Sequence, residues 1–311
     1  MKPSATKISG VNFDSSTREI VIILVTLLFS HSSFATDPYE RDTAYIGIMS
    51  RLMYSTDRID TSIATELVFT EFIKNIGKKG EFFNFDTAET VIKEMQLHRL
   101  DAVLADTLSY LDIDHMTNKN HRYSIVFGES KVQKIILLTR RSDKISNLKQ
   151  LKGKRFTHPL GNNLGLLFLN VSLMKEGLPT AKRFFATSTP APDINTAIID
   201  LFFNKADAAL VTDFAFKTAS ELNTQIAREL EVLISSEPII PMIIGINKHV
   251  PKEFIEKVDK MATRLHEFPK MLHLLSMFKG KGIAKLSDQD LHSARVLKQT
   301  YDNLISVRKA E

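Results

Sequence analysis

The feature that most constrains this chain is the alternation of short apolar runs with segments of helical period. Thr43–Met49, Glu81–Phe85 and Asp101–Ala105 have the length and composition of strands. Thr61–Ile76 and Ala88–Leu97 separate them and carry apolar residues at helical spacing. Strands that alternate with helices form mainly parallel sheets flanked by helices, with the following loops gathered at the carboxyl ends of the strands. The sequence therefore predicts an α/β fold.

A second round of the same alternation runs from Asn147 to Asp213, and strand-like runs lie on either side of it. Pro241 indicates an edge or crossover position for the last of these runs. The remaining elements expected are strands at Ser124–Gly128, Lys134–Thr139, Asp207–Asp213, Glu231–Ile234 and Pro238–Ile246, helices at Glu253–Phe268, Pro269–Met277 and Ser287–Ser306, and a flexible turn at Lys279–Gly282. After Pro251 the chain is thus expected to be entirely helical.

This order predicts two lobes joined by two crossings. We expect residues 36–130 and 237–311 to form lobe 1, with the C-terminal helices, and residues 131–236 to form lobe 2. Each lobe is expected to hold a mixed, mainly parallel sheet flanked by helices, and a helical tail ends the chain. A small ligand would then bind between lobes that close by hinge motion.

The N-terminal segment has the pattern of a secretory signal peptide. Lys2, Lys7 and Arg18 precede the apolar run Ile20–Phe29, which is too short to span a bilayer as a helix. Small residues, including Ala35, follow it in the pattern of a signal-peptidase site. We expect residues 1–35 to be a signal peptide cleaved after about Ala35, which places the protein in the periplasm; a segment retained as an anchor is the alternative.

The composition excludes several kinds of site. The chain has 311 residues, of which 43% are hydrophobic and 25% charged, as in globular proteins with a core. Its net charge of +5 is spread along the chain, which argues against a nucleic-acid partner. It has no cysteine, and its histidines are dispersed, so no metal is expected. It contains no P-loop, dinucleotide fingerprint or nucleophile elbow, so neither a cofactor nor an enzyme is expected.

Several segments occur in an order that is typical of one family. They are Leu148–Phe156, a charged turn that leads into a strand, then Gly161–Gly165, Asp193–Ala197, Asn204–Ala209 and Ser235–Pro241. In this order they resemble the phosphate/phosphite/phosphonate-type (PhnD-like) ABC transporter periplasmic substrate-binding proteins, which have the type II periplasmic binding fold. The resemblance covers roughly residues 44–268.

The resemblance implies a monomeric periplasmic protein that closes on a small polar solute and delivers it to an ABC permease. Anionic solutes such as phosphonates and phosphate are among the candidates. A stand-alone periplasmic sensor of the same fold, feeding a receptor kinase or cyclase in the membrane, is the alternative that the sequence leaves open.

The candidate ligand contacts lie where predicted strands end or helices begin. Helix capping is the competing role for several of them, and a solvated loop position is the competing role for Arg51. The set comprises Arg51, Tyr54, Asp106, Thr107, Asn162, Asn163, Gly165, Ser188, Asp193, Thr212 and Asp213.

One loop departs from the family pattern. The family carries Ser-Thr-Ser-Gly at the helix start where hydroxyl and backbone donors hold phosphonate oxygens. The matching residues here are Asn162, Asn163, Leu164 and Gly165. The two amides can donate hydrogen bonds but Leu164 cannot, so we expect a compact tri-oxyanion to be held less well.

Overall fold

The computed structural model describes residue 39 and the ranges 41–49, 58–277 and 279–310. The predicted signal peptide with its cleavage site after Ala35 lies outside the described residues, as do Arg51 and Tyr54. The chain divides into two units, Met1–Glu40 and Arg41–Glu311, and the second contains all the elements below.

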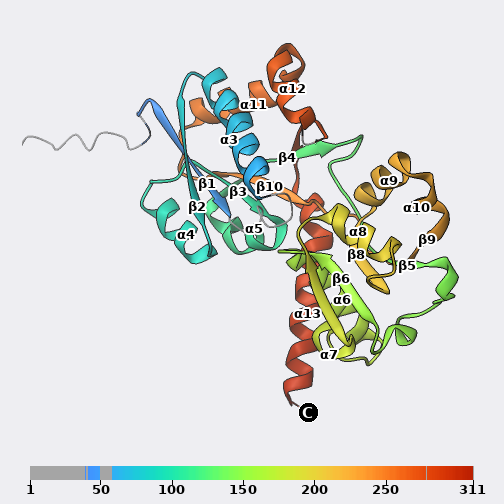
Figure 1. The fold of residues 1–311 in the computed structure, drawn as a ribbon. Helices are drawn as coiled ribbons and strands as arrows, with labels where there is room; N and C mark the ends of the chain where they lie inside the picture. Colours follow the sequence, from blue (N-terminus) through green and yellow to red (C-terminus); the bar gives the residue numbers. More distant parts are fainter. Residues whose placement is uncertain (1–38, 40, 50–57, 278, 311) are drawn as a thin grey trace, which may run out of the picture. The chain divides into compact units, whose positions relative to one another are not determined.

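The first sheet is six-stranded, in the order β11-β4-β10-β3-β1-β2 (Figure 1). β1 pairs in parallel with β2 and β3, whereas β10 and β11 join through antiparallel pairs. Its strands are β1 (Thr43–Met49), β2 (Lys79–Phe85), β3 (Ala102–Asp106), β4 (Thr117–Phe127), β10 (Met242–Asn247) and β11 (Gly280–Leu286). The helices of this part are α3 (Arg58–Asn75), α4 (Ala88–Gln96), α5 (Thr107–Ile113), α11 (Lys252–Thr263) and α12 (Pro269–Met277), with 3₁₀ turns η1 (Asp114–Met116), η4 (Leu265–Glu267) and η5 (Asp288–Leu291).

The second sheet is five-stranded, in the order β7-β6-β8-β5-β9. β6 pairs in parallel with β7 and β8, and β5 is antiparallel to β8 and β9. Its strands are β5 (Ile135–Arg140), β6 (Arg155–Pro159), β7 (Thr187–Ala191), β8 (Ala208–Thr212) and β9 (Leu230–Ser235). Around it lie α6 (Asn163–Lys175), α7 (Ala181–Phe184), α8 (Ile194–Phe202), α9 (Asp213–Leu222), α10 (Thr224–Glu229), η2 (Arg141–Asp143) and η3 (Leu148–Leu151).

Burial explains why these sequences form these elements. In the internal strands β3 and β8, every residue but the last is buried, which is why both appear in the sequence as continuous apolar runs. In α4 the buried residues Val91 and Met95 are one helical turn apart, and the Thr87 hydroxyl accepts a hydrogen bond from the Thr90 N–H to cap the helix.

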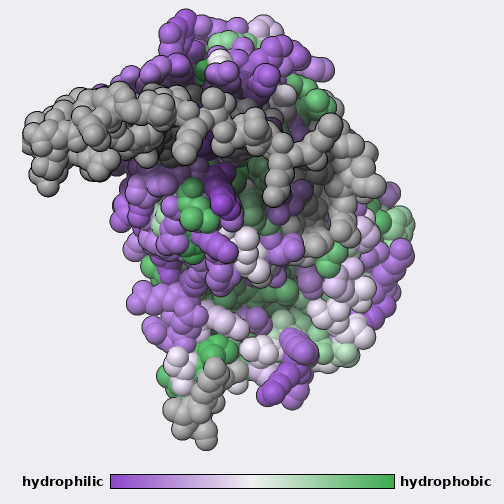
Figure 2. All heavy atoms as spheres, turned by 90° about the vertical axis from the view of Figure 1, so that its left-hand side faces the viewer, coloured by the Kyte–Doolittle hydropathy of each residue, from purple (hydrophilic) through white to green (hydrophobic). Residues whose placement is uncertain are grey.

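On the face drawn in Figure 2, hydrophilic residues prevail in the upper part of the view and hydrophobic side chains show in separate groups.

The chain passes between the sheets from β4 to β5 and from β9 to β10, and the last helix contacts both parts. α13 (His292–Ala310) packs against α6, where Ala294 and Leu297 join the core of the second sheet (Figure 1). Toward the first sheet, Arg295 Nη2 of the same helix lies 2.7 Å from Asp114 Oδ2, and Lys298 pairs with Asp112 of α5. The helical tail expected from the sequence is therefore tied to both sheets.

The α/β class is confirmed, and two details differ from expectation. The segment after Pro251 is not entirely helical, because Gly280–Leu286 forms β11 and pairs with β4 instead of forming a turn. The sheets are mixed as expected, but fewer of their pairs are parallel, since each strand that follows a crossing enters its sheet antiparallel. β11 was missed because it is an edge strand with several partly exposed residues, so it lacks an apolar alternation.

Candidate functional site

The candidate residues of the second sheet lie at one edge. β7, β6 and β8 are adjacent and parallel, so the residues that follow their carboxyl ends meet at the same edge. Asn162 and Asp193 follow β6 and β7, Thr212 is the last residue of β8, and each is the N-cap of the next helix. The structure therefore brings these predicted residues together and also gives each of them a capping role.

Asp106 caps α5 at the carboxyl end of β3. Its Oδ1 accepts hydrogen bonds from the N–H groups of Leu108 and Ser109, both at 3.1 Å, and its Oδ2 accepts one from the Ser109 hydroxyl at 2.5 Å. Thr107 is fully buried, and its hydroxyl donates to the carbonyl oxygen of Ile240. Asp106 keeps partial exposure, whereas the Thr107 side chain is bound to the second crossing.

The loop before α6 is stabilised by its own hydrogen bonds. Asn162 Oδ1 accepts from the Gly165 N–H at 3.0 Å, and the Asn163 N–H donates to the Gly161 carbonyl at 2.7 Å. Asn162 has φ −72° and ψ 60°, the geometry of an inverse γ-turn. Asn163 is half-buried, and its side-chain amide has no hydrogen-bond partner within the described part of the chain.

Asp193 and Ser188 belong to the edge strand β7 and the turn after it. Asp193 Oδ1 accepts from the Thr196 N–H at 2.8 Å and its Oδ2 from the Thr196 hydroxyl at 2.7 Å. Ser188 is exposed and is the second residue of β7, in register with Phe156 of β6. Ser188 therefore lies along the outermost strand of the sheet, away from the carboxyl ends where the other candidate residues lie.

Thr212 and Asp213 link the end of β8 to the start of β5. The Thr212 hydroxyl accepts from the Ala215 N–H at 3.3 Å. Asp213 Oδ1 accepts from the N–H groups of Lys134 at 3.0 Å and Phe214 at 2.8 Å. Lys134 is an exposed cation at this edge that the sequence analysis did not include among the candidate contacts; its place at the start of the predicted strand Lys134–Thr139 was the available signal.

His158 is a second residue of this region that the sequence analysis missed. It lies two residues before the loop that opens α6, is 6% exposed, and stacks on Phe156 with ring centroids 5.3 Å apart. Burial lowers the pKa of His158 below its ordinary value, so its ring is neutral at pH 7. Nδ1 lies 3.0 Å from the Pro159 carbonyl oxygen, which assigns the proton to Nδ1 and leaves Nε2 an acceptor.

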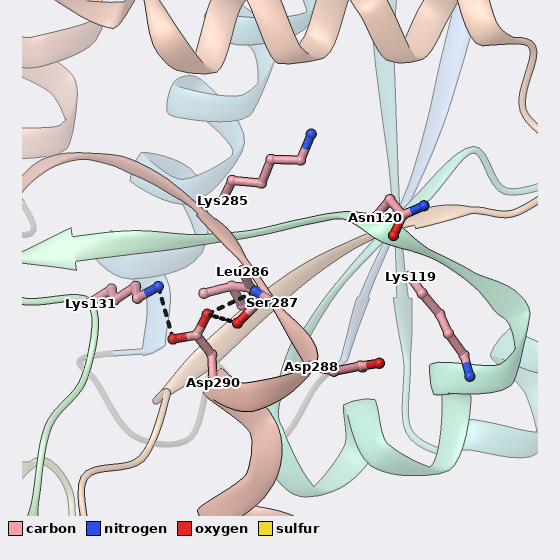
Figure 3. Close-up of a pocket in the computed structure, with 8 residues that line it drawn as sticks. All are labelled: Lys119, Asn120, Lys131, Lys285, Leu286, Ser287, Asp288 and Asp290. Atoms are coloured by element: carbon pink, nitrogen blue, oxygen red, sulfur yellow. Dashed lines mark hydrogen bonds and ion pairs between the residues drawn. The ribbon is translucent and has the colours of Figure 1, made fainter.

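A depression of about 570 Å³ lies elsewhere, beside β4, β11 and η5. Figure 3 shows that the ammonium groups of Lys119 and Lys285 point in different directions. Asp290 is bonded to Lys131 and Ser287, and the hydrogen bond from Arg122 holds the pKa of Asp288 below its ordinary value. Its charged groups are largely paired and do not converge on one point, so this depression lacks the features of a ligand site. It is lined by Lys119, Asn120, Lys131, Lys285, Leu286, Ser287, Asp288 and Asp290.

The described ranges hold no group of three or more His, Asp or Glu side chains placed to bind a metal ion. Within the same ranges, no helix has the length and apolar character needed to cross a membrane.

Three solved structures of bacterial proteins have a similar fold. PhnD1 from Prochlorococcus marinus, in complex with methylphosphonate, has a TM-score of 0.61 at 13% identity and covers 85% of this chain and 99% of its own. The binding protein component of an ABC phosphonate transporter from Pseudomonas aeruginosa has a TM-score of 0.60 at 14% identity, covering 84% and 87%. XAC2383 from Xanthomonas citri, bound to ATP, has a TM-score of 0.60 at 13% identity, covering 86% and 99%. These likenesses show the type II periplasmic binding fold.

No curated protein matches the sequence. The family model described as "ABC transporter, phosphonate, periplasmic substrate-binding protein" matches residues 59–291, which is more than half of the chain. Members of that family are substrate-binding proteins of ABC transporters rather than enzymes, and membership implies a periplasmic location, a small-molecule ligand and an ABC permease as partners. This chain belongs to the family of periplasmic substrate-binding proteins of phosphonate ABC transporters.

Proposed function

We propose that the mature chain, beginning near Thr36, is the monomeric solute receptor of an ABC importer. In this proposal residues 36–130 with 237–311 and residues 131–236 are the two lobes, and they close on a small polar solute. The observation that carries the site is the common edge formed by the carboxyl ends of β6, β7 and β8, where partly exposed polar residues begin three helices. Solutes in α/β proteins bind at such edges.

The proposed contacts are the residues expected from the sequence, to which Lys134 is added, and they differ from one another in role. Asn163 offers a side-chain amide that is not engaged elsewhere among the described residues, and the exposed residue Lys134 comes just before β5 at the same edge. Asp106 and Asp193 are caps and Asp213 is the first residue of α9; all three keep acceptor capacity, since a carboxylate has about four lone-pair sites. The remaining members of the proposed set are Arg51, Tyr54, Thr107, Asn162, Gly165, Ser188 and Thr212.

A thermal-shift screen of the purified mature chain tests this function. The panel contains phosphate, methylphosphonate (bound in PhnD1), sulfonates, amino acids and quaternary amines. A solute at a hundred times its Kd stabilises the folded state by about 2.7 kcal/mol, which raises the melting temperature measurably. If no solute of a broad panel raises the melting temperature, the receptor function is excluded. Calorimetry then measures the Kd of any solute that does raise it.

The membrane partner and the processing of the N-terminus have separate tests. Solute-dependent ATP hydrolysis by the cognate permease in liposomes, on addition of the mature chain, would support import. Mass spectrometry of the exported protein locates the cleavage, expected after about Ala35. Size-exclusion chromatography with light scattering checks the monomer.

A further inference from the structure

The start of α6 is closed by the chain itself. An oxyanion at a helix start is held by the N–H groups of the first turn, which are otherwise unsatisfied. Here the Gly165 N–H donates to Asn162 Oδ1 at 3.0 Å and the Asn163 N–H donates to the Gly161 carbonyl at 2.7 Å. Of the first three helical residues, Leu164 alone has an N–H without a partner within the described ranges. The backbone of this helix start therefore keeps one free donor, whereas several are needed to replace the water shell of a phosphonate.

The space at this helix start is also filled. A Cβ atom built on Gly165 would lie 2.5 Å from both Nδ2 and Oδ1 of Asn162. The Asn162 side chain therefore lies directly over Gly165, and only glycine at that position leaves room for it. The glycine that carries the family resemblance thus accommodates an asparagine side chain in this protein.

The backbone geometry keeps the asparagine in place. Gly161 has a φ of +77°, in the left-handed region, and Asn162 then forms the inverse γ-turn. The other caps at strand ends have extended ψ values, such as 157° at Asp106 and 173° at Asp193. The Asn163 N–H is hydrogen-bonded within the γ-turn, and the Gly165 N–H is hydrogen-bonded to the cap. An oxyanion that used these two donors would have to break both existing hydrogen bonds.

The carboxylates at this edge do not compensate an anion. Asp193 and Asp213 present carboxylates there, and they accept hydrogen bonds rather than donate them. An added dianion would meet like charge close to these groups. Lys134, an exposed residue whose backbone N–H donates to Asp213, is the cation that the described residues place beside them. The edge of the second sheet is therefore better suited to a solute that donates hydrogen bonds.

We infer that Asn162 is a specificity-determining residue, whose side chain occupies the place of an oxyanion at the start of α6 and excludes phosphonate and phosphate. The solute is then a polar molecule without such a group. This inference rests on the proposed receptor function, because it concerns the selectivity of the same site.

The test is a gain of binding for a defined probe. Isothermal titration with methylphosphonate, and separately with inorganic phosphate, is done on the wild-type mature chain and on Asn162→Gly. Glycine is well tolerated at N-caps, so the variant is expected to fold, and circular dichroism checks this. Asn223→Gly is the matched control, because Asn223 caps α10 in the same way, with its Oδ1 3.0 Å from the Gln225 N–H.

We expect the wild type and Asn223→Gly to bind methylphosphonate with a Kd above about 1 mM, and Asn162→Gly to bind it at least tenfold more tightly, about 1.4 kcal/mol. Micromolar binding of methylphosphonate or phosphate by the wild type would overturn the inference. The inference would also be overturned if Asn162→Gly and Asn223→Gly bound methylphosphonate with the same affinity, whether or not that affinity exceeded the affinity of the wild type. Asn162→Ala repeats the test if Asn162→Gly does not fold.

The two proposals fail differently. If the wild type binds methylphosphonate tightly, the receptor function stands and the role of Asn162 is wrong. If the wild type binds no solute of the panel but Asn162→Gly gains methylphosphonate, the role of Asn162 stands and the receptor function fails.

Discussion

Gln133 and Ile239 donate a backbone hydrogen bond to each other, with N–O distances of 2.9 and 2.8 Å. Gln133 lies in the first crossing between the sheets and Ile239 in the second. Two residues farther along the first crossing, the Ile135 N–H donates to Ser236 Oγ at 2.9 Å, and the Ser236 N–H donates back to the Ile135 carbonyl at 2.8 Å. The two crossings therefore form one paired ribbon, and a hinge motion has to bend both together.

Removing one of these bonds is expected to lower the free energy of unfolding. Gln133→Pro deletes the N–H that donates to Ile239, at a cost of about 1 kcal/mol or more. Gln133→Ala keeps the backbone bond and is the control for loss of the side chain. Urea denaturation of both variants measures the difference; equal stability would show that the bond is not important for the fold.

Arg122 is expected to be among the most sensitive charged residues of the first sheet. Its side chain is fully buried, with Nη2 2.5 Å from Asp114 Oδ1 and Nη1 2.6 Å from Asp288 Oδ1. Arg122→Ala removes the buried cation that Asp114 and Asp288 share, leaves them the partly exposed Arg295 as partner, and should cost about 3 kcal/mol or more. The exposed pair of Arg141 and Glu231, at 3.1 Å, supplies the control: Arg141→Ala should cost at most about 1 kcal/mol. Equal losses in chemical denaturation would contradict this ranking.

Asp207 gives the second sheet a predictable response to acid. Hydrogen bonds from Arg155 and Arg140 hold the pKa of this carboxyl below its ordinary value, and the bond from Arg155 has the largest effect. Because the folded-state pKa is depressed, the stabilisation is complete above the unfolded value of about 3.9 and is lost as the pH falls toward the folded value.

We therefore expect Asp207→Asn to lower the free energy of unfolding at pH 7 by about 1.5 kcal/mol or more. The gap between wild type and variant should narrow below about pH 4, because the Asp207 carboxyl is then protonated in the unfolded state before it is protonated in the folded state, so the wild type loses this stabilisation. Urea titrations at several pH values measure it. A gap that stays constant between pH 7 and pH 2 would refute the assignment.

Asn163 is expected to matter for affinity rather than stability. Asn163→Leu removes an amide at the start of α6 that is free among the described residues, so the solute found in the thermal-shift screen should bind at least about tenfold more weakly. Asn75→Leu, at the exposed end of α3, is the control and should leave the Kd unchanged. Unchanged affinity in Asn163→Leu would remove this residue from the proposed site.

The sequence predicted those parts of the fold that depend on local pattern. The internal strands β3 and β8 were found because both of their faces are buried, and Asp193 was found as a helix start because a capping side chain acts within three residues. Partners distant in the sequence were not found: Asp288 lies 166 residues from Arg122, and no local pattern relates them.

The candidate site was predicted in position but not in chemistry. Residue types at the start of α6 showed that the family's hydroxyls are missing. They did not show that Asn162 turns back onto Gly165, because that depends on the φ of Gly161 and on the γ-turn that follows. The position of Lys134 beside Asp213 likewise depends on the antiparallel return of β5, which the sequence pattern did not indicate.

The placement of β11 has a consequence for the order of folding. The strands of the second sheet all come from one continuous stretch, residues 135–235, whereas the first sheet needs residues 280–286 at its edge beside β4. The sheet that begins first in the sequence is thus completed last, after nearly the whole chain is available. This long-range closure delays a stable first sheet until synthesis is almost finished.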